Sequence, residues 1–144
     1  MGALCVCGFA LKPYSSICIS LYPKQIGGDV RVKAVFLDRD GTIGGTGGGM
    51  HPFDFSMYDF APQAIKSLNE IGVKVFLFTN QTRVGRGYFT EDELLKGFMM
   101  MEEELAYHSA FLDGIYYCPH KPDDGCECQK PNIGLLLKAK KCII

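Results

Sequence analysis

The sequence lacks a surplus of charge of either sign, and it lacks long apolar runs. Its 15 Lys and Arg residues nearly balance its 16 Asp and Glu residues, which gives a formal net charge of −1 at pH 7. We therefore expect no nucleic-acid or membrane partner. No stretch reaches the roughly 18 consecutive apolar residues of a membrane-spanning helix. A chain of 144 residues, 47% of them hydrophobic, is instead long enough for one globular domain with its own core.

The glycine-rich stretch 44–49 lacks the features of a nucleotide-binding loop. No GxxxxGK[ST] pattern is present, so a phosphate cradle of that type is not predicted. We expect residues 44–49 to form a flexible flap over a site. His51 follows this stretch, and a lone loop histidine is more often solvated or packed than in contact with a substrate.

The cysteines are also inconsistent with a fully paired disulfide framework, because there are seven of them. We expect a reducing, cytoplasmic compartment. Cys118, His120, Cys126 and Cys128 supply three sulfurs and one imidazole within a short loop. Four such donors predict a closed, tetrahedral, structural zinc site and disfavour magnesium or calcium. The alternative is a set of free buried cysteines beside an incidental histidine.

Short apolar runs alternate with helical patterns along residues 31–144, which we take as one domain. Residues 1–30 are expected to be an extension of unknown structure, with Gly27-Gly28 as a natural boundary. The predicted strands are 33–37, 73–78 and 115–118. The predicted helices begin near Pro62, Thr90 and Ile133. This order predicts an α/β fold with a parallel sheet and right-handed crossovers.

Two details of the helices follow from the pattern. In the first helix, Ile65, Leu68 and Ile71 share one face, and Gly72 suits the C-terminal cap. In the second, the segment from Thr90 to Glu93 has the capping-box pattern, and Leu94, Phe98, Met101 and Leu105 mark the buried side. Residues 82–89 are expected to form a loop.

Polar side chains follow two of the predicted strands. Asp38 and Asp40 come after the first strand, and Thr79, Asn80 and Gln81 end the second. Carboxyl ends of parallel strands meet at one edge of a sheet, where open α/β sheets place their chemistry. Taken alone, the DxDGT pattern at 38–42 is equally consistent with a simple Asx turn or capping loop.

Five segments occur in one order over residues 33–140: FLDRDGT, FTNQ, RGYFTE, CPH and C-x-C-x-KP. Together they closely resemble subfamily IIIA of the haloacid dehalogenase (HAD) superfamily, in the branch of histidinol-phosphatases and D,D-heptose 1,7-bisphosphate phosphatases. The resemblance implies a three-layer, HAD-like Rossmannoid fold without a large cap domain. It also implies a small, magnesium-dependent, cytoplasmic phosphatase with a zinc loop.

The resemblance assigns roles to particular residues. Asp38 would be the nucleophile that forms an aspartyl-phosphate, and Asp40 would act as the general acid and base. Thr79 would hydrogen-bond the transferring phosphoryl group, and Lys130 would offset its charge. Magnesium would bind the Asp38 carboxylate and the backbone oxygen of Asp40.

The substrate side is less well defined by the resemblance. Asn80, Gln81 and Arg86 would line it. Gln129 stands where relatives usually carry an arginine, and glutamine cannot clamp an anion bidentately as arginine does. The substrate is therefore left as a small phosphorylated metabolite, either a sugar phosphate of the heptose bisphosphate kind or histidinol phosphate.

One family element is not found in the sequence. The acidic GDxxxD-like fourth motif and the strand before it are missing, so we expect a C-terminally truncated domain or an incomplete magnesium site. Activity of this chain is expected to be poor or absent. The leading hypothesis is a phosphomonoester hydrolase. One alternative is a non-catalytic, zinc-stabilised HAD fragment that binds a ligand or partner. Another is a redox or regulatory zinc module that uses Cys118, Cys126 and Cys128.

Overall fold

The computed structural model of the chain describes residues 33–141 and 143, so the predicted extension 1–30 lies outside the described residues. Three strands form a parallel sheet in the order β1-β2-β3. Their bounds are β1 Ala34–Leu37, β2 Lys74–Asn80 and β3 Gly114–Cys118. The predicted α/β fold and the three predicted strands are confirmed, each within two residues of its predicted ends.

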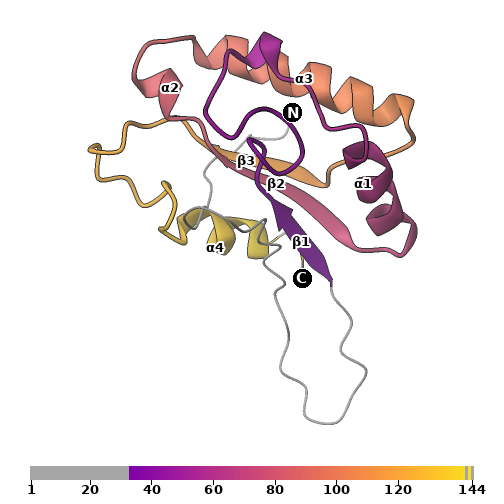
Figure 1. The fold of residues 1–144 in the computed structure, drawn as a ribbon. Helices are drawn as coiled ribbons and strands as arrows, with labels where there is room; N and C mark the ends of the chain where they lie inside the picture. The colour runs from indigo at the N-terminus through magenta and orange to yellow at the C-terminus, as the bar shows by residue number, and fades with distance from the viewer. Residues whose placement is uncertain (1–32, 142, 144) are drawn as a thin grey trace.

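Helices cover both faces of this sheet and make a three-layer arrangement (Figure 1). α1 (Ala61–Glu70) and α3 (Glu91–Tyr107) lie on one face, and α4 (Gly134–Lys140) lies on the other. A 3₁₀ turn, η1 (Pro52–Asp54), and a short helix, α2 (Thr82–Gly85), complete the described elements. None of these helices is long and apolar enough to cross a bilayer.

Alternation along the strands divides the core between the two faces, because successive side chains of a strand point in opposite directions. Val35 and Val75, which lie side by side in the register, face α1 and α3. Phe36 and Phe76 face α4, and their rings stack at a centroid distance of 5.2 Å. Strands that are buried on both faces are apolar at nearly every position, which is why the three strands could be predicted from the sequence.

The capping box at the start of α3 is confirmed. Thr90 Oγ1 accepts a hydrogen bond from the Glu93 N–H at 3.2 Å, and Glu93 Oε2 accepts one from the Thr90 N–H at 2.7 Å. The predicted buried side of α3 is also confirmed. Its residues are all at most 3% exposed: Leu94, Phe98, Met101 and Leu105.

Two local predictions are wrong. Ile71 does not extend the buried face of α1 and is 74% exposed. The helix ends at Glu70 with Ile71 as its C-cap, and Gly72 then takes a positive φ of +76°, so Ile71 lies in the turn and not on the buried face of the helix. Residues 82–89 are not wholly a loop, because α2 occupies their first half.

Candidate active site

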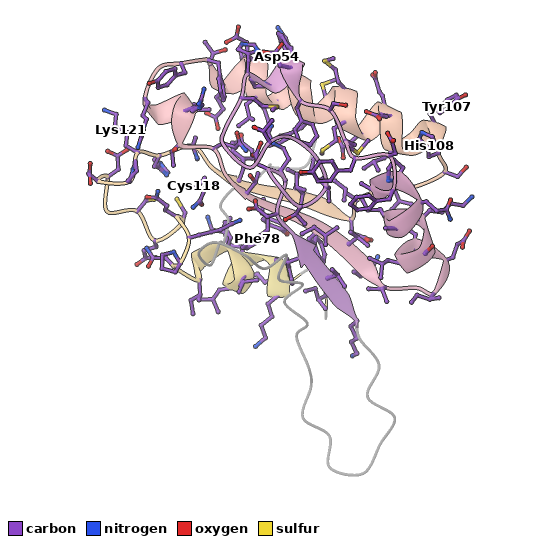
Figure 2. All side chains as sticks on the ribbon, viewed as in Figure 1. Asp54, Phe78, Tyr107, His108, Cys118 and Lys121 are labelled. Atoms are coloured by element: carbon purple, nitrogen blue, oxygen red, sulfur yellow. The ribbon has the colours of Figure 1, made fainter. Side chains whose placement is uncertain are left out.

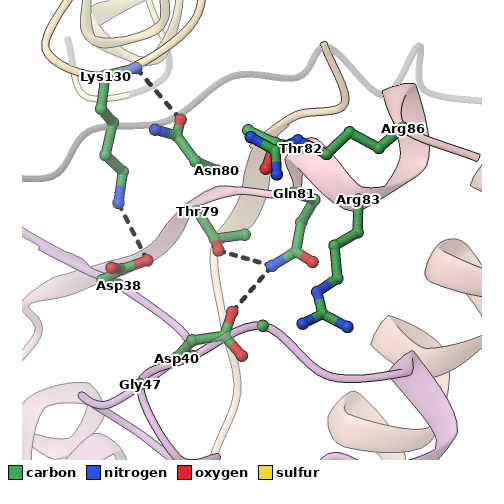
Figure 3. A pocket seen from close by; sticks show the side chains of 12 residues that line it. Asp38, Asp40, Gly47, Thr79, Asn80, Gln81, Thr82, Arg83, Arg86 and Lys130 are labelled. Carbon is green, nitrogen blue, oxygen red and sulfur yellow. Dashed lines mark hydrogen bonds and ion pairs between the residues drawn. The ribbon is translucent and has the colours of Figure 1, made fainter. Parts of the chain in front are cut away.

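The polar strand ends do meet in one pocket, of about 370 Å³. Asp38 follows β1, Thr79 ends β2, and Lys130 comes from the connection between β3 and α4 (Figure 3). Its lining contains six other side chains (Asp40, Asn80, Gln81, Thr82, Arg83, Arg86) and three glycines (Gly47, Gly48, Gly49). The structure thus gathers every predicted catalytic and substrate residue except Gln129, which precedes Lys130 but does not line the pocket.

Asp38 and Lys130, which both line the pocket, form an ion pair. Lys130 Nζ lies 3.0 Å from Asp38 Oδ1, and no other described residue accepts a hydrogen bond from this amine. The backbone N–H of Arg39 also donates to Asp38 Oδ1, at 2.9 Å. Burial raises the pKa of Asp38, although Lys130 pulls it back down. Burial likewise lowers the pKa of Lys130 against the pull of Asp38. Keeping both Asp38 and Lys130 ionised in the pocket therefore costs free energy.

Asp40 is held in place from two directions. The guanidinium of Arg39 donates to both of its carboxylate oxygens, from Nε to Oδ2 at 3.1 Å and from Nη2 to Oδ1 at 3.0 Å. The side-chain amide of Gln81 donates to Asp40 Oδ2 at 3.0 Å. A carboxylate with both oxygens engaged by donors keeps one orientation.

Gln81 and Asn80 bond to other pocket residues. Gln81 Nε2 donates to Thr79 Oγ1 at 2.9 Å as well as to Asp40, and only 4% of Gln81 is exposed. Asn80 Oδ1 accepts a hydrogen bond from the backbone N–H of Lys130 at 3.1 Å. The end of β2 thus holds both the acid/base candidate and the segment that carries the lysine.

Sequence reasoning missed two arginines of the site. Arg39 is 1% exposed, and its guanidinium lies over the rings of Phe55 and Phe98. The signal was an arginine directly after a buried strand, where a charge needs partners. Arg83 lines the pocket under the glycine flap. A Cβ on Gly49 would meet Arg83 Nε at 2.8 Å, so a larger residue at this position would require the Arg83 side chain to shift.

The four predicted zinc ligands come together at the end of β3. Their donor atoms all lie within 4.8 Å of one another: Cys118, His120, Cys126 and Cys128. Cys118 Sγ is 3.6 Å from Cys126 Sγ, 3.7 Å from Cys128 Sγ and 3.5 Å from His120 Nδ1. Ligands at about 2.0 to 2.3 Å in a tetrahedron are separated by roughly 3.5 to 3.8 Å. The three distances from Cys118 suit a zinc ion, whereas His120 Nδ1 lies closer to Cys128 Sγ, at 3.0 Å.

The protonation and redox states of these sulfurs also bear on metal binding. Burial raises the pKa of the Cys118 thiol to about 12. A bound cation would have to displace that proton, as zinc does when thiolates ligate it. Cys128 is disulfide-bonded in this structure, so ligation by this sulfur requires its reduced form.

The parallel sheet, the aspartates after β1 and the lysine near β3 define an α/β protein of the HAD-like phosphatase class. No family model matches the chain. Among curated proteins, it is 42% identical over 116 residues to the D-glycero-beta-D-manno-heptose-1,7-bisphosphate 7-phosphatase of Haemophilus influenzae, which covers 76% of this chain and 63% of the relative. It is 39% identical over 105 residues to the probable D-glycero-D-manno-heptose-1,7-bisphosphate 7-phosphatase of Thermoplasma volcanium, covering 72% of each.

A solved structure agrees. The D,D-heptose 1,7-bisphosphate phosphatase of B. bronchiseptica, complexed with magnesium and phosphate, superposes with a TM-score of 0.72 at 33% identity. The match covers 78% of this chain and 64% of that one. The chain belongs to the family of HAD-like heptose-bisphosphate phosphatases. It spans about three-fifths of the length of several of these curated relatives.

Proposed function

We propose that the chain hydrolyses a phosphomonoester through an aspartyl-phosphate at Asp38, with magnesium as cofactor. The observation that carries this proposal is the pocket itself, in which a partly buried aspartate, a second fixed aspartate and a buried lysine lie together. A related phosphatase of known structure holds magnesium and phosphate, which supports the same chemistry here.

Four residues of the pocket have a defined part in the two steps. A carboxylate oxygen of Asp38 attacks phosphorus, the bond to the alcohol oxygen breaks, and Asp40 donates a proton to that oxygen. Water then attacks the aspartyl-phosphate, Asp40 takes up the proton of the water, and inorganic phosphate leaves. Thr79 donates its hydroxyl hydrogen to a phosphoryl oxygen, and Lys130 donates to the developing negative charge.

Charge explains why the site needs cations. A carboxylate about 4 Å from one phosphate charge is repelled by roughly 4 kcal/mol at an effective dielectric near 20. Lys130 offsets part of this repulsion. Magnesium, when bound, would offset more of it, and the Asp38 carboxylate with the Asp40 backbone oxygen supplies the oxygen ligands that magnesium prefers. Asp38 Oδ1 is contacted by Lys130 Nζ at 3.0 Å and by the backbone N–H of Arg39 at 2.9 Å.

We propose a sugar phosphate as the substrate class, because the curated relatives are named for a heptose bisphosphate. Arg83 and Arg86 line the pocket and would attract a second phosphate group of such a substrate. Histidinol phosphate is the other candidate that the sequence suggests, and a cytoplasmic location stays a prediction.

We propose further that zinc occupies the Cys/His cluster and stabilises the loop before α4. The cluster spans Cys118 at the end of β3 and Cys128, two residues before Lys130. Fixing this loop would fix the lysine against Asp38. The role is structural, because four protein donors leave no open coordination position.

The test is phosphate release from 4-nitrophenyl phosphate by the purified 144-residue chain, with and without magnesium. We expect weak, metal-dependent turnover that falls to the background of the assay in Asp38→Asn. Asp59→Asn is the matched control, because Asp59 is exposed and does not line the pocket. Full turnover in Asp38→Asn would overturn the mechanism.

The same measurement decides between the proposal and the non-catalytic alternative. A folded chain that binds zinc but shows no metal-dependent turnover would be a ligand- or partner-binding member of the family. Exposed, readily oxidised thiols with no bound zinc would instead favour the redox module.

A further inference from the structure

We propose that Arg39 is a positioning residue that aims the Asp40 carboxylate at the leaving group. This inference rests on the proposed function and deepens it. The arginine lies between the two aspartates in the sequence, and the proposed chemistry gives it no contact with the substrate. Its place in the structure shows why a fully buried guanidinium is retained there.

The guanidinium is enclosed and has no access to solvent. Arg39 is 1% exposed, with Phe55 at 4.7 Å and Phe98 at 5.9 Å from its Cζ to the ring centroids. Phe98 belongs to α3, and both phenylalanines pack in the core on the α1/α3 face. Arginine stacks on aromatic faces and is held in a fixed plane by them. The aromatic rings therefore set the plane of the donor group.

That plane is matched to Asp40. Two nitrogens of the guanidinium reach two oxygens of the carboxylate, at 3.1 and 3.0 Å. Nη2 also donates to Gln81 Oε1 at 3.2 Å, which orients the amide so that Gln81 Nε2 donates to Asp40 Oδ2. The side chains of Arg39 and Gln81 thus hold Asp40 from two sides, and only 14% of the Asp40 side chain is exposed.

A purely structural ion pair would not need this arrangement. The pair lies at the wall of the pocket, and Gln81 links it to Thr79, the proposed phosphoryl ligand. The network therefore ties the orientation of the proton donor to the position of the phosphoryl group. Misplacing a catalytic group by about 1 Å can lower a rate by about a hundredfold.

A change of the leaving group distinguishes a positioning role of Arg39 from a purely structural one. 4-Nitrophenyl phosphate and phenyl phosphate are similar in size, but 4-nitrophenolate is a stable anion and leaves without a proton. Phenolate, like the tyrosine side chain, has a pKa near 10 and depends more on general acid catalysis. A variant that only misplaces Asp40 should lose phenyl phosphate turnover preferentially.

The experiment compares kcat/KM of wild type, Arg39→Lys and Arg39→Met on both esters. We expect the Lys variant, which keeps the charge but loses the planar fork, to fall about a hundredfold on phenyl phosphate and at most about threefold on 4-nitrophenyl phosphate. Gln81→Glu, added to the Arg39→Lys variant, should not restore the lost turnover of phenyl phosphate, because it adds a second carboxylate beside Asp40. Tyr117→Phe is the control for lost stability, since it perturbs the same layer next to Phe98 without touching Asp40.

Every outcome bears on the inference. Equal losses on both esters that track a lowered melting temperature, as a structural arginine would give, would overturn it. So would unchanged kinetics in Arg39→Met. If wild type shows no magnesium-dependent turnover of either ester, the proposed function fails and the inference fails with it. Turnover by wild type with a selective loss in Arg39→Lys supports both.

Discussion

The two faces of the sheet are closed in different ways. α1 and the 17-residue α3 cover one face with a large apolar core, and α3 begins with a complete capping box. The other face is covered by α4, which has seven residues and no side-chain cap at its start, together with the Cys/His loop (Figure 2). A helix this short is marginal by itself. The face that α4 covers, here called the thin face, therefore needs another source of stability.

The pocket draws on both faces. Asp40 is held by Arg39, which packs against Phe55 and Phe98 of the well-packed face. Lys130 comes from the loop on the thin face and is tied to β2 by Asn80. One half of the site is thus positioned by apolar packing, and the other half depends on a loop with a cluster of metal donors. Changes on the thin face should therefore alter activity and stability together.

Among changes that compare the two faces, the largest effect is expected when Lys130 is replaced. Lys130→Met should lower kcat by about a hundredfold to a thousandfold, because one donor to the developing charge disappears. Steady-state phosphate release measures this. Lys96→Met is the control, since Lys96 is an exposed lysine of α3. A loss smaller than threefold would show that Lys130 does not face the phosphoryl group during catalysis.

Removal of one ligand from the Cys/His cluster should have the next largest effect. Cys126→Ser should abolish zinc binding and lower the free energy of unfolding by several kcal/mol. Zinc content by elemental analysis and denaturant unfolding measure the two effects. Activity should fall as well, because Lys130 follows the cluster. Glu127→Gln alters an exposed, non-ligating neighbour and should change none of these.

On the well-packed face, Tyr117→Phe should change stability in a pH-dependent way. Tyr117 donates to Glu91 Oε1 at 2.7 Å, and burial, with a smaller contribution from Glu91, raises the pKa of Tyr117 above its ordinary value of 10.0. The fold therefore favours the protonated phenol. Its contribution to stability is fully present below pH 10 and is lost as pH rises above it, by up to about 1.4 kcal/mol per pH unit.

The measurement is the difference in unfolding free energy between wild type and Tyr117→Phe from about pH 9 to about pH 11. The difference should shrink as pH rises, whereas turnover near neutral pH should be unchanged. A difference that does not vary with pH would mean that the phenol is not protected by the fold.

The smallest effect is expected at the cap of α3. Thr90→Ala should lower the free energy of unfolding by about 1 kcal/mol, because the Glu93 N–H loses its acceptor. Thr90→Ser should retain most of that stability. Turnover should be the same in both variants, and a loss of activity in Thr90→Ala would contradict the independence of this face from the chemistry.

Much of the fold could be read from the sequence because its signals are local. The apolar runs of β1 to β3 and the capping box at Thr90 are short patterns that depend on neighbouring residues. Ile71 shows the limit of such reasoning, since the periodic pattern continues past Glu70, where the helix ends. That the polar residues after β1 and at the end of β2 meet in one pocket could also be predicted, because parallel strands bring their carboxyl ends together, whereas Lys130 and Arg86 were expected from the family resemblance.

The partners within the site were not predictable. Gln81 was expected to contact the substrate, yet its amide bonds to Asp40 and Thr79. Arg39 was passed over, because a sequence does not show which charge is enclosed by aromatic rings. Both depend on contacts between residues about 40 positions apart, and such distances are set only by packing.

The sequence by itself determined the three strands, their parallel direction, the aspartates at a strand end and the four clustered metal donors, since each follows from local spacing and strand polarity. Only the tertiary structure decided which carboxylate pairs with Lys130 and which is fixed by Arg39. It did so because the burial of a charge, and the choice of its partner, depend on segments that the chain brings together from both faces of the sheet.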